Sequence, residues 1–123
     1  MIVGLGTGST VFFTLERLGE RVAEEGLQIS GVPTSRDTEG KARELGIELV
    51  GLADVEAIDL TIDGADEIDG AFRMIKGGGG ALLREKVVAS ISEREVIIVG
   101  QDKVVEKLGT TFLLPVEVAS FAL

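Results

Sequence analysis

Short apolar segments alternate along this chain with segments of helical periodicity, and this alternation constrains the fold more than any other feature. Val11, Leu15 and Leu18, for example, recur at the spacing of one helix face. Strands separated by helices favour right-handed β-α-β units, so we expect an α/β fold, a Rossmann-like, mostly parallel sheet with helices on both faces. The expected strands are 2–4, 28–32, 47–50, 58–62, 72–75, 95–99 and 114–118. The first expected helix directly follows the turn at 4–10, and three further helices are expected at 35–46, 81–92 and 102–108.

The residue composition excludes several kinds of chemistry. The 123 residues include no His, Cys, Tyr or Trp, which excludes a histidine base, a thiol nucleophile and a zinc site with nitrogen and sulfur ligands. Proton transfer must therefore fall to Asp, Glu or Lys. The formal net charge of −9 argues against nucleic acid or an anionic membrane as a partner, because both need a basic surface. It does not exclude a phosphorylated metabolite. Neither a signal peptide nor a long apolar span is recognisable, so we expect one cytoplasmic domain over 1–123.

The segment Gly4–Thr10, GLGTGST, follows the first expected strand and opens the first expected helix. Such a junction presents free backbone amides at the positive end of the helix dipole, which favours an anion. The alternative is a tight turn with a Ser or Thr N-cap, and this segment alone does not decide between the two. Ser9 stands where a dinucleotide fingerprint needs its third glycine, and no glycine–lysine pair marks a P-loop. A phosphate site without a nucleotide is the better interpretation.

The acidic stretch DGADEID follows another expected strand, so its loop and the first glycine loop should open on the same edge of the sheet. Asp63 and Asp66 flank Gly64, whose conformational freedom can aim both carboxylates to one side. The alternative is a solvated acidic loop, and we expect Glu67 and Asp69 to be surface charges of that kind. The spacing of the aspartates does not match the ligands of an EF-hand, and no metal is expected.

Lys76 leads into the four consecutive glycines Gly77–Gly80, and Glu85 follows about one turn into the next expected helix. Because glycine destabilises both helices and strands, this run predicts a loop whose amides approach a ligand. The helix N-terminus is expected to lower the pKa of Glu85 and so keep it ionised and able to take a proton. A salt-bridged helix face with Lys86 is the alternative for Glu85. Lys103 follows a strand and should also lie at the ligand edge, although plain surface exposure would equally explain it.

Taken together, these segments resemble the type A ribose-5-phosphate isomerase family. The matching pieces are GLGTGST, TSRDTEGKARELGI, DLTIDGADEID, MIKGGGGALLREK, VGQDK and LPVEV, in that order and at family-like spacing. DGADEI followed by KGGG and then REK is a highly specific combination. The resemblance implies the reversible interconversion of ribose 5-phosphate and ribulose 5-phosphate, without metal or organic cofactor. The substrate is then a small sugar phosphate.

The family pattern also implies which residues carry the reaction. Glu85 matches the proton acceptor, and isomerisation through a cis-enediolate needs one such base. Lys76 and the glycine-loop amides can stabilise the negative charge on the enediolate oxygens. We assign Asp63, with Lys76, to ring opening, and Asp66 to a sugar hydroxyl or the neighbouring lysine. The implied substrate-binding residues are Thr7, Gly8, Ser9, Thr10, Asp63, Gly64, Ala65, Asp66, Lys76, Gly77, Gly78, Gly79 and Lys103.

Relative to the family, the chain is expected to lack an N-terminal helix and a C-terminal lobe. The apolar segment 118–123 would then lack a packing partner. We expect either a piece of a longer chain or a variant that self-associates as a homo-oligomer, a dimer or tetramer. Two other functions stay open. One is a non-catalytic sugar-phosphate-binding protein. The other is a related enzyme on the same scaffold: a coenzyme A transferase, which Glu85 alone does not exclude, or an amino-sugar-phosphate deaminase, which the absence of histidine disfavours.

Overall fold

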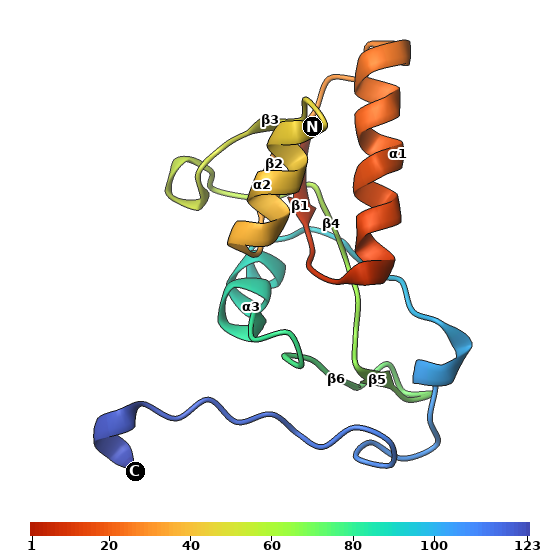
Figure 1. Ribbon diagram of the computed structural model, residues 1–123, viewed down its shortest axis with the longest axis vertical. Helices are drawn as coiled ribbons and strands as arrows, with labels where there is room; N and C mark the ends of the chain where they lie inside the picture. The colour runs from red at the N-terminus through yellow and green to blue at the C-terminus, as the bar shows by residue number, and fades with distance from the viewer.

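A five-stranded parallel sheet forms the centre of the computed structural model, which describes all residues 1–123 (Figure 1). The strand order is β3-β2-β1-β4-β7, and each neighbouring pair is parallel. The strands are β1 (Ile2–Leu5), β2 (Ser30–Pro33), β3 (Glu48–Leu49), β4 (Leu60–Asp63) and β7 (Glu95–Ile97). The helices are α1 (Ser9–Glu25), α2 (Arg36–Glu44) and α3 (Leu82–Ser90), with a 3₁₀ turn at Leu52–Asp54. The expected α/β fold is confirmed.

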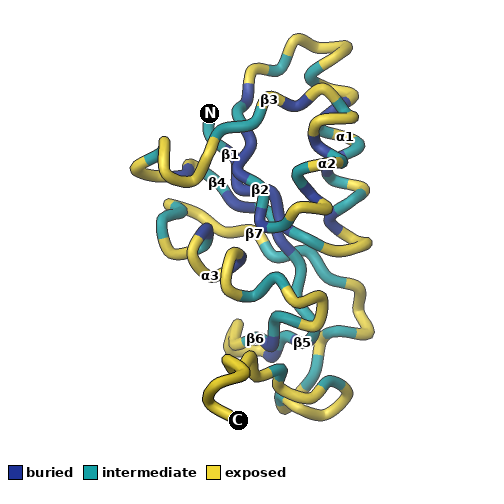
Figure 2. The backbone as a smooth tube through the Cα atoms, turned by 60° about the vertical axis from the view of Figure 1, so that its left-hand side comes forward, coloured by how far each residue is buried: buried dark blue, intermediate teal, exposed yellow.

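Helices cover both faces of the sheet, as expected. On one face, Leu5 of β1 lies in a buried cluster with Leu15 of α1 and Ala42 of α2. On the other face, Val32 of β2 lies in a second buried cluster with Val88 of α3. Figure 2 shows the buried residues concentrated on the strands and on the helix faces turned toward them. None of the helices combines the length and the apolar character that crossing a membrane requires.

Helix α2 begins where the sequence predicts. Ser35 is its N-cap, and the side-chain oxygen of Ser35 accepts the backbone N–H of Thr38 at 3.1 Å. This contact satisfies one of the amides that the first helical turn leaves without a partner. The N-terminal end of α2 is therefore fixed beside the C-terminal end of β2.

A separate antiparallel ribbon lies beyond the C-terminal end of β4 (Figure 1). It consists of β5 (Glu67–Ile68) and β6 (Met74–Ile75). The extended segment expected at 72–75 thus forms part of this ribbon, and it is not a strand of the main sheet. Because β6 ends directly before Lys76, the ribbon fixes the start of the loop Gly77–Gly80, which we call the glycine loop.

Two expected elements are wrong. The helix expected at 102–108 is reduced to a 3₁₀ turn, Gln101–Lys103. Seven residues are too few for a helix that no apolar face holds in place. The strand expected at 114–118 pairs with nothing and runs exposed along the bottom of Figure 1 toward a 3₁₀ turn at Ser120–Ala122. β-Branched residues form a strand only where a free sheet edge receives them, and Pro115 lacks the amide that such pairing needs.

Candidate active site

The C-terminal ends of β1, β4 and β7 open into one cavity of about 210 Å³. The loops predicted to meet at this edge of the sheet do meet there. The cavity is lined by Thr7, Gly8, Ser9, Thr10, Val11, Gly64, Ala65, Asp66, Lys76, Gly77, Gly78, Gly79, Glu85, Ile98, Val99 and Lys103. Every predicted site residue is in this set except Asp63.

The loop between β1 and α1 leaves the first amides of α1 free. A Cβ on Gly6 would lie 2.3 Å from Oδ1 and 2.6 Å from Cα of Asp63, so only glycine permits this approach to β4. Gly8 then turns the chain into the helix with a φ of 121°, a conformation that other residues rarely adopt. No side chain caps α1, which excludes the alternative of a Ser or Thr N-cap. The unpartnered amides of Ser9 and Thr10 belong to residues that line the cavity.

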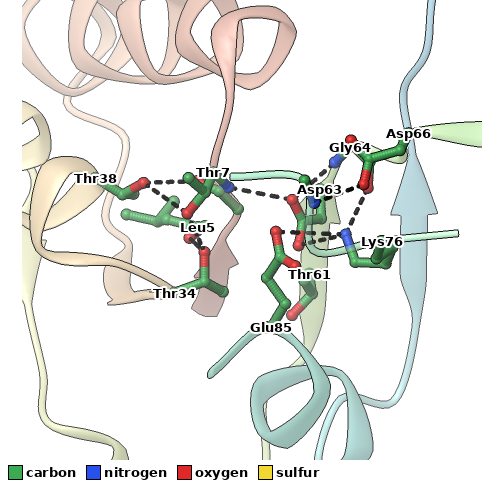
Figure 3. Close-up of polar contacts among 12 residues, drawn as sticks. Leu5, Thr7, Thr34, Thr38, Thr61, Asp63, Gly64, Asp66, Lys76 and Glu85 are labelled. Atoms are coloured by element: carbon green, nitrogen blue, oxygen red, sulfur yellow. Dashed lines mark hydrogen bonds and ion pairs between the residues drawn. The ribbon is translucent and has the colours of Figure 1, made fainter. Parts of the chain in front are cut away.

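The hydroxyl of Thr7 forms hydrogen bonds within the protein. Its Oγ1 lies 2.8 Å from Oγ1 of Thr34 and 3.2 Å from Oγ1 of Thr38 (Figure 3). Those two hydroxyls already donate their protons to the carbonyl oxygens of Leu5, at 3.0 Å, and Gly6, at 2.8 Å. Since each hydroxyl has one proton, the proton of Thr7 is directed to the nearer of the two hydroxyls, that of Thr34. Thr7 therefore offers the cavity only an acceptor oxygen.

Asp63 lies beneath the floor of the cavity, with 1% of its surface exposed. Its Oδ1 accepts the backbone N–H of Thr7 at 3.1 Å and that of Gly64 at 2.7 Å. Its Oδ2 lies 3.0 Å from Nζ of Lys76. The carboxylate thus fixes both loops and the lysine, and it is not in the cavity wall where a substrate-binding residue was expected.

Lys76 and Glu85 form the charged centre of the cavity wall (Figure 3). Nζ of Lys76 lies 3.6 Å from Oε1 of Glu85 and donates to the carbonyl oxygen of Gly64 at 2.5 Å. The side chain of Glu85 is 8% exposed, and its Oε2 is buried without a hydrogen-bond partner. Glu85 therefore has one oxygen held by a cation and one free to receive a proton.

Burial raises the pKa of Glu85 above its ordinary value, and the negative charge of Asp63 adds to the effect, while Lys76 opposes it. The predicted lowering by the helix N-terminus is wrong. Removing a carboxylate from water disfavours its charged form. Here this effect of burial outweighs the opposite effect of the positive charge of Lys76. A raised pKa makes Glu85 a stronger base than an exposed glutamate.

The profile of the family described as ribose 5-phosphate isomerase A (phosphoriboisomerase A) matches residues 30–123. The chain belongs to this family. A ribose-5-phosphate isomerase A from Listeria innocua is 60% identical over 121 residues, covering 98% of this chain and 53% of that protein. One from Roseobacter denitrificans is 59% identical over 123 residues, covering 100% of this chain and 47% of that protein.

Solved structures of the family share the fold. The ribose 5-phosphate isomerase from Plasmodium falciparum matches with a TM-score of 0.87 at 51% identity, over 90% of this chain and 48% of that one. A D-ribose-5-phosphate isomerase in complex with phospho-erythronic acid matches with a TM-score of 0.88 at 38% identity, over 90% of this chain and 49% of that one. This chain of the isomerase A family spans about half the length of the relatives it matches.

Asp66 holds the glycine loop of this family member. Its Oδ2 accepts the backbone N–H of Gly78 at 2.8 Å. The alternative expectation, that Asp66 fixes the neighbouring lysine, is wrong, because Lys76 pairs with Asp63 and Glu85. Asp66 still lines the cavity, so its other oxygen remains available to a sugar hydroxyl.

Glu67 was expected at the surface and is fully buried. Its carboxylate accepts the backbone N–H groups of Gly109, Thr111 and Phe112, together with the hydroxyl of Thr111. Burial acts to raise the pKa of Glu67, but these hydrogen bonds outweigh it and lower the pKa to about 2. No local signal could have revealed these partners, since they lie more than forty residues further along the chain.

Asp69 was also expected at the surface and is buried. Its Oδ1 accepts the backbone N–H groups of Ala71 and Arg73, and its Oδ2 lies 2.7 Å from a guanidinium nitrogen of Arg73. The hydrogen bond from Arg73 lowers the pKa of Asp69. Here a signal existed, because an Asp before Gly that bonds amides two residues on is typical of a turn.

Proposed function

We propose that this chain interconverts ribose 5-phosphate and ribulose 5-phosphate, with Glu85 as the proton acceptor. The observation that carries the proposal is that Glu85 lines the cavity and has a buried Oε2 without a hydrogen-bond partner, while the free amides at the start of α1 face the same cavity. Membership of the isomerase A family supports the reaction. The family structure that contains phospho-erythronic acid supports a sugar phosphate as the ligand.

The phosphate of the substrate binds at the N-terminal end of α1. Free amides and the helix dipole favour an anion there, and the hydroxyls of Ser9 and Thr10 add two donors. Lys103, also in the cavity wall, supplies a positive charge. Thr7 donates nothing to the phosphate, since its proton is directed to Thr34.

Glu85 takes the proton from C2 of the open-chain sugar, and the electrons of that bond form the C1–C2 double bond of a cis-enediolate. The hydroxyl proton on O2 passes to O1, and Glu85 returns its proton to C1, which gives the ketose. The ammonium of Lys76 and the glycine-loop amides stabilise the enediolate oxygens. Because Lys76 holds Oε1 of Glu85, Oε2 is the atom that exchanges protons with carbon.

Ring opening follows from the same arrangement. Lys76 is in the cavity wall, whereas Asp63 lies beneath it. Lys76 therefore contacts the ring oxygens, and Asp63 acts through Lys76 by orienting its ammonium group at 3.0 Å.

The variant Glu85→Gln tests the proposal. It keeps the shape of the side chain and removes the base, so kcat should fall about 10²- to 10⁴-fold while binding of ribose 5-phosphate persists. In the wild type, kcat/KM should decrease on the acid side with an apparent pKa above 4.5, because Glu85 must be unprotonated and its pKa is raised. Conversion is followed by the appearance of ribulose 5-phosphate, with the exposed Glu93→Gln as matched control.

Two outcomes would contradict the proposal. Full turnover in Glu85→Gln would remove Glu85 from the chemistry. Phosphate-dependent binding by the wild type without any conversion would favour the sugar-phosphate-binding alternative.

Location and assembly are further proposals. We propose a cytoplasmic protein that forms a homo-oligomer, a dimer or tetramer. The large apolar side chains exposed between 113 and 123, among them Leu113 and Phe121, support self-association because such side chains gain stability when a partner covers them.

A further inference from the structure

The carboxylate of Glu67 has no part in the proposed chemistry, yet it holds a distant loop. Its Oε2 accepts the amide of Gly109 at 2.6 Å, and its Oε1 accepts those of Thr111 and Phe112 at 2.5 and 2.8 Å. The hydroxyl of Thr111 donates to the same Oε1 at 2.7 Å. A buried carboxylate with four donors from one short loop holds that loop as a unit. We call residues 109–112 the clamped loop.

The clamped loop packs against the glycine loop. A Cβ on Gly78 would lie 2.6 Å from Cζ of Phe112 and 2.6 Å from Oδ1 of Asp66. The amide of Gly78 donates to Oδ2 of Asp66. Gly78 is therefore in close contact with both the ring of Phe112 on the clamped loop and the carboxylate of Asp66 on the cavity wall.

The same ribbon also anchors Lys103. Ile68, the residue after Glu67, forms a parallel bridge with Val104, and its carbonyl oxygen accepts the amide of Val105 at 2.9 Å. Lys103 directly precedes this bridge and lines the cavity. The chain from 103 to 112 is thus tied to β5 at both ends, by backbone pairing at one and by the Glu67 carboxylate at the other.

We propose that Glu67 is a positioning residue for substrate binding: through the clamped loop and Phe112 it keeps the glycine loop ordered against the cavity. The identity of the ligand rests on the proposed function. A run of four glycines loses more backbone freedom on ordering than any other sequence. If the loop is not ordered beforehand, binding must order it, and apparent affinity falls with the fraction of ordered molecules.

Once substrate is bound to a variant without Glu67 and has ordered the glycine loop, the loop amides lie around the enediolate oxygens as in the wild type, so the bound complex should react at the wild-type rate. Asp63, which orients Lys76, belongs to β4, and Glu85 belongs to α3. Neither forms a hydrogen bond or an ion pair with the clamped loop. The change expected from loss of Glu67 is therefore in KM and not in kcat. Because the pKa of Glu67 is about 2, it stays ionised in any practical assay, and the effect should not vary with pH.

The variant Glu67→Gln tests the proposal, since its amide group would meet backbone N–H donors with a donor of its own. We expect KM for ribose 5-phosphate to rise about 10-fold or more while kcat stays within about 3-fold, and the amide hydrogen of Gly78 to exchange faster with solvent. Phe112→Ala keeps the carboxylate contacts and removes only the ring. It should raise KM and Gly78 exchange in the same way. Glu106→Gln, exposed on the same segment, is the control and should change neither.

A fall in kcat at unchanged KM, or unchanged Gly78 exchange in both variants, would overturn the positioning role. If Glu67→Gln fails to fold, Phe112→Ala decides the question alone. If the wild type shows no turnover, the proposed function fails, and amide exchange in the variants still tests the role of Glu67.

Discussion

Replacing Lys76 with methionine should destabilise the protein strongly, because it removes the cation from a buried cluster with two carboxylates. Nζ lies 3.0 Å from Asp63 and 3.6 Å from Glu85, and the three side chains are 13%, 1% and 8% exposed. At an effective dielectric constant of about 20, each pair contributes about 5 kcal/mol of Coulomb attraction. Desolvation and the repulsion between the carboxylates offset much of this, so we expect a net loss of about 3–5 kcal/mol in the free energy of unfolding at pH 8.

The loss of stability caused by Lys76→Met should become smaller as the pH falls. The pKa of Glu85 is raised in the folded protein, so the folded state binds more protons than the unfolded state between the ordinary and the raised value. Its contribution to stability is therefore greatest below 4.5 and decreases as the pH rises through the raised value. Without Lys76, which lowers this pKa, the decrease extends to higher pH. The gap between variant and wild type is then widest at pH 8 and narrower at pH 5.

Urea unfolding followed by circular dichroism at pH 5, 6.5 and 8 measures this gap. Lys107→Met is the matched control, because Lys107 is exposed and in no ion pair, and it should change stability by less than about 0.5 kcal/mol. A loss below about 1 kcal/mol for Lys76→Met at pH 8, or an equal loss at pH 5 and pH 8, would refute the reasoning.

Two further predictions concern local structure, and the same unfolding experiment measures both. Gly6→Ala should destabilise by about 1–3 kcal/mol, since its Cβ would lie 2.6 Å from Cα of Asp63; Gly40→Ala in α2, whose Cβ meets nothing, should instead stabilise by about 0.5–1 kcal/mol. Equal effects of the two alanines would contradict the close approach. Ser35→Ala should lose about 1 kcal/mol, because it removes the N-cap of α2, and wild-type stability would show that the cap is not needed.

The parts of the fold that the sequence predicted are those that neighbouring residues determine. The apolar spacing around Leu15 and the cap at Ser35 are local signals, and both helices form where expected. The segments 102–108 and 114–118 carry equally local signals of helix and strand. They fail because no sheet edge or apolar surface of the structure receives them, and this depends on contacts far away in the chain.

In the candidate site, too, some features were predictable from the sequence and others depended on distant contacts. That the loops would share one cavity was predictable, because parallel strands place their carboxyl ends on one edge. The depth of each side chain below that edge was not. Asp63 lies beneath the floor because Gly6 lets β1 approach it, and the pKa of Glu85 shifts upward because α3 buries it. Burial of a charged group depends on what packs over it, and residue spacing does not contain that information.

The acidic stretch DGADEID explains how an anion site can exist in a protein of net charge −9. Asp63 and Glu67 accept backbone amides and are not part of the cavity wall, and Asp69 bonds Arg73 in its own turn. Their negative charge is thus satisfied within the protein. The cavity wall itself contains two carboxylates, Asp66 and Glu85, together with the free amides of α1 and two lysines, Lys76 and Lys103. The local field at a ligand depends on where each charge is held and by which donors. Asp63, Glu67 and Asp69 thus stabilise the loops that carry the donors. A phosphate at the N-terminal end of α1 contacts backbone amides and ammonium groups there.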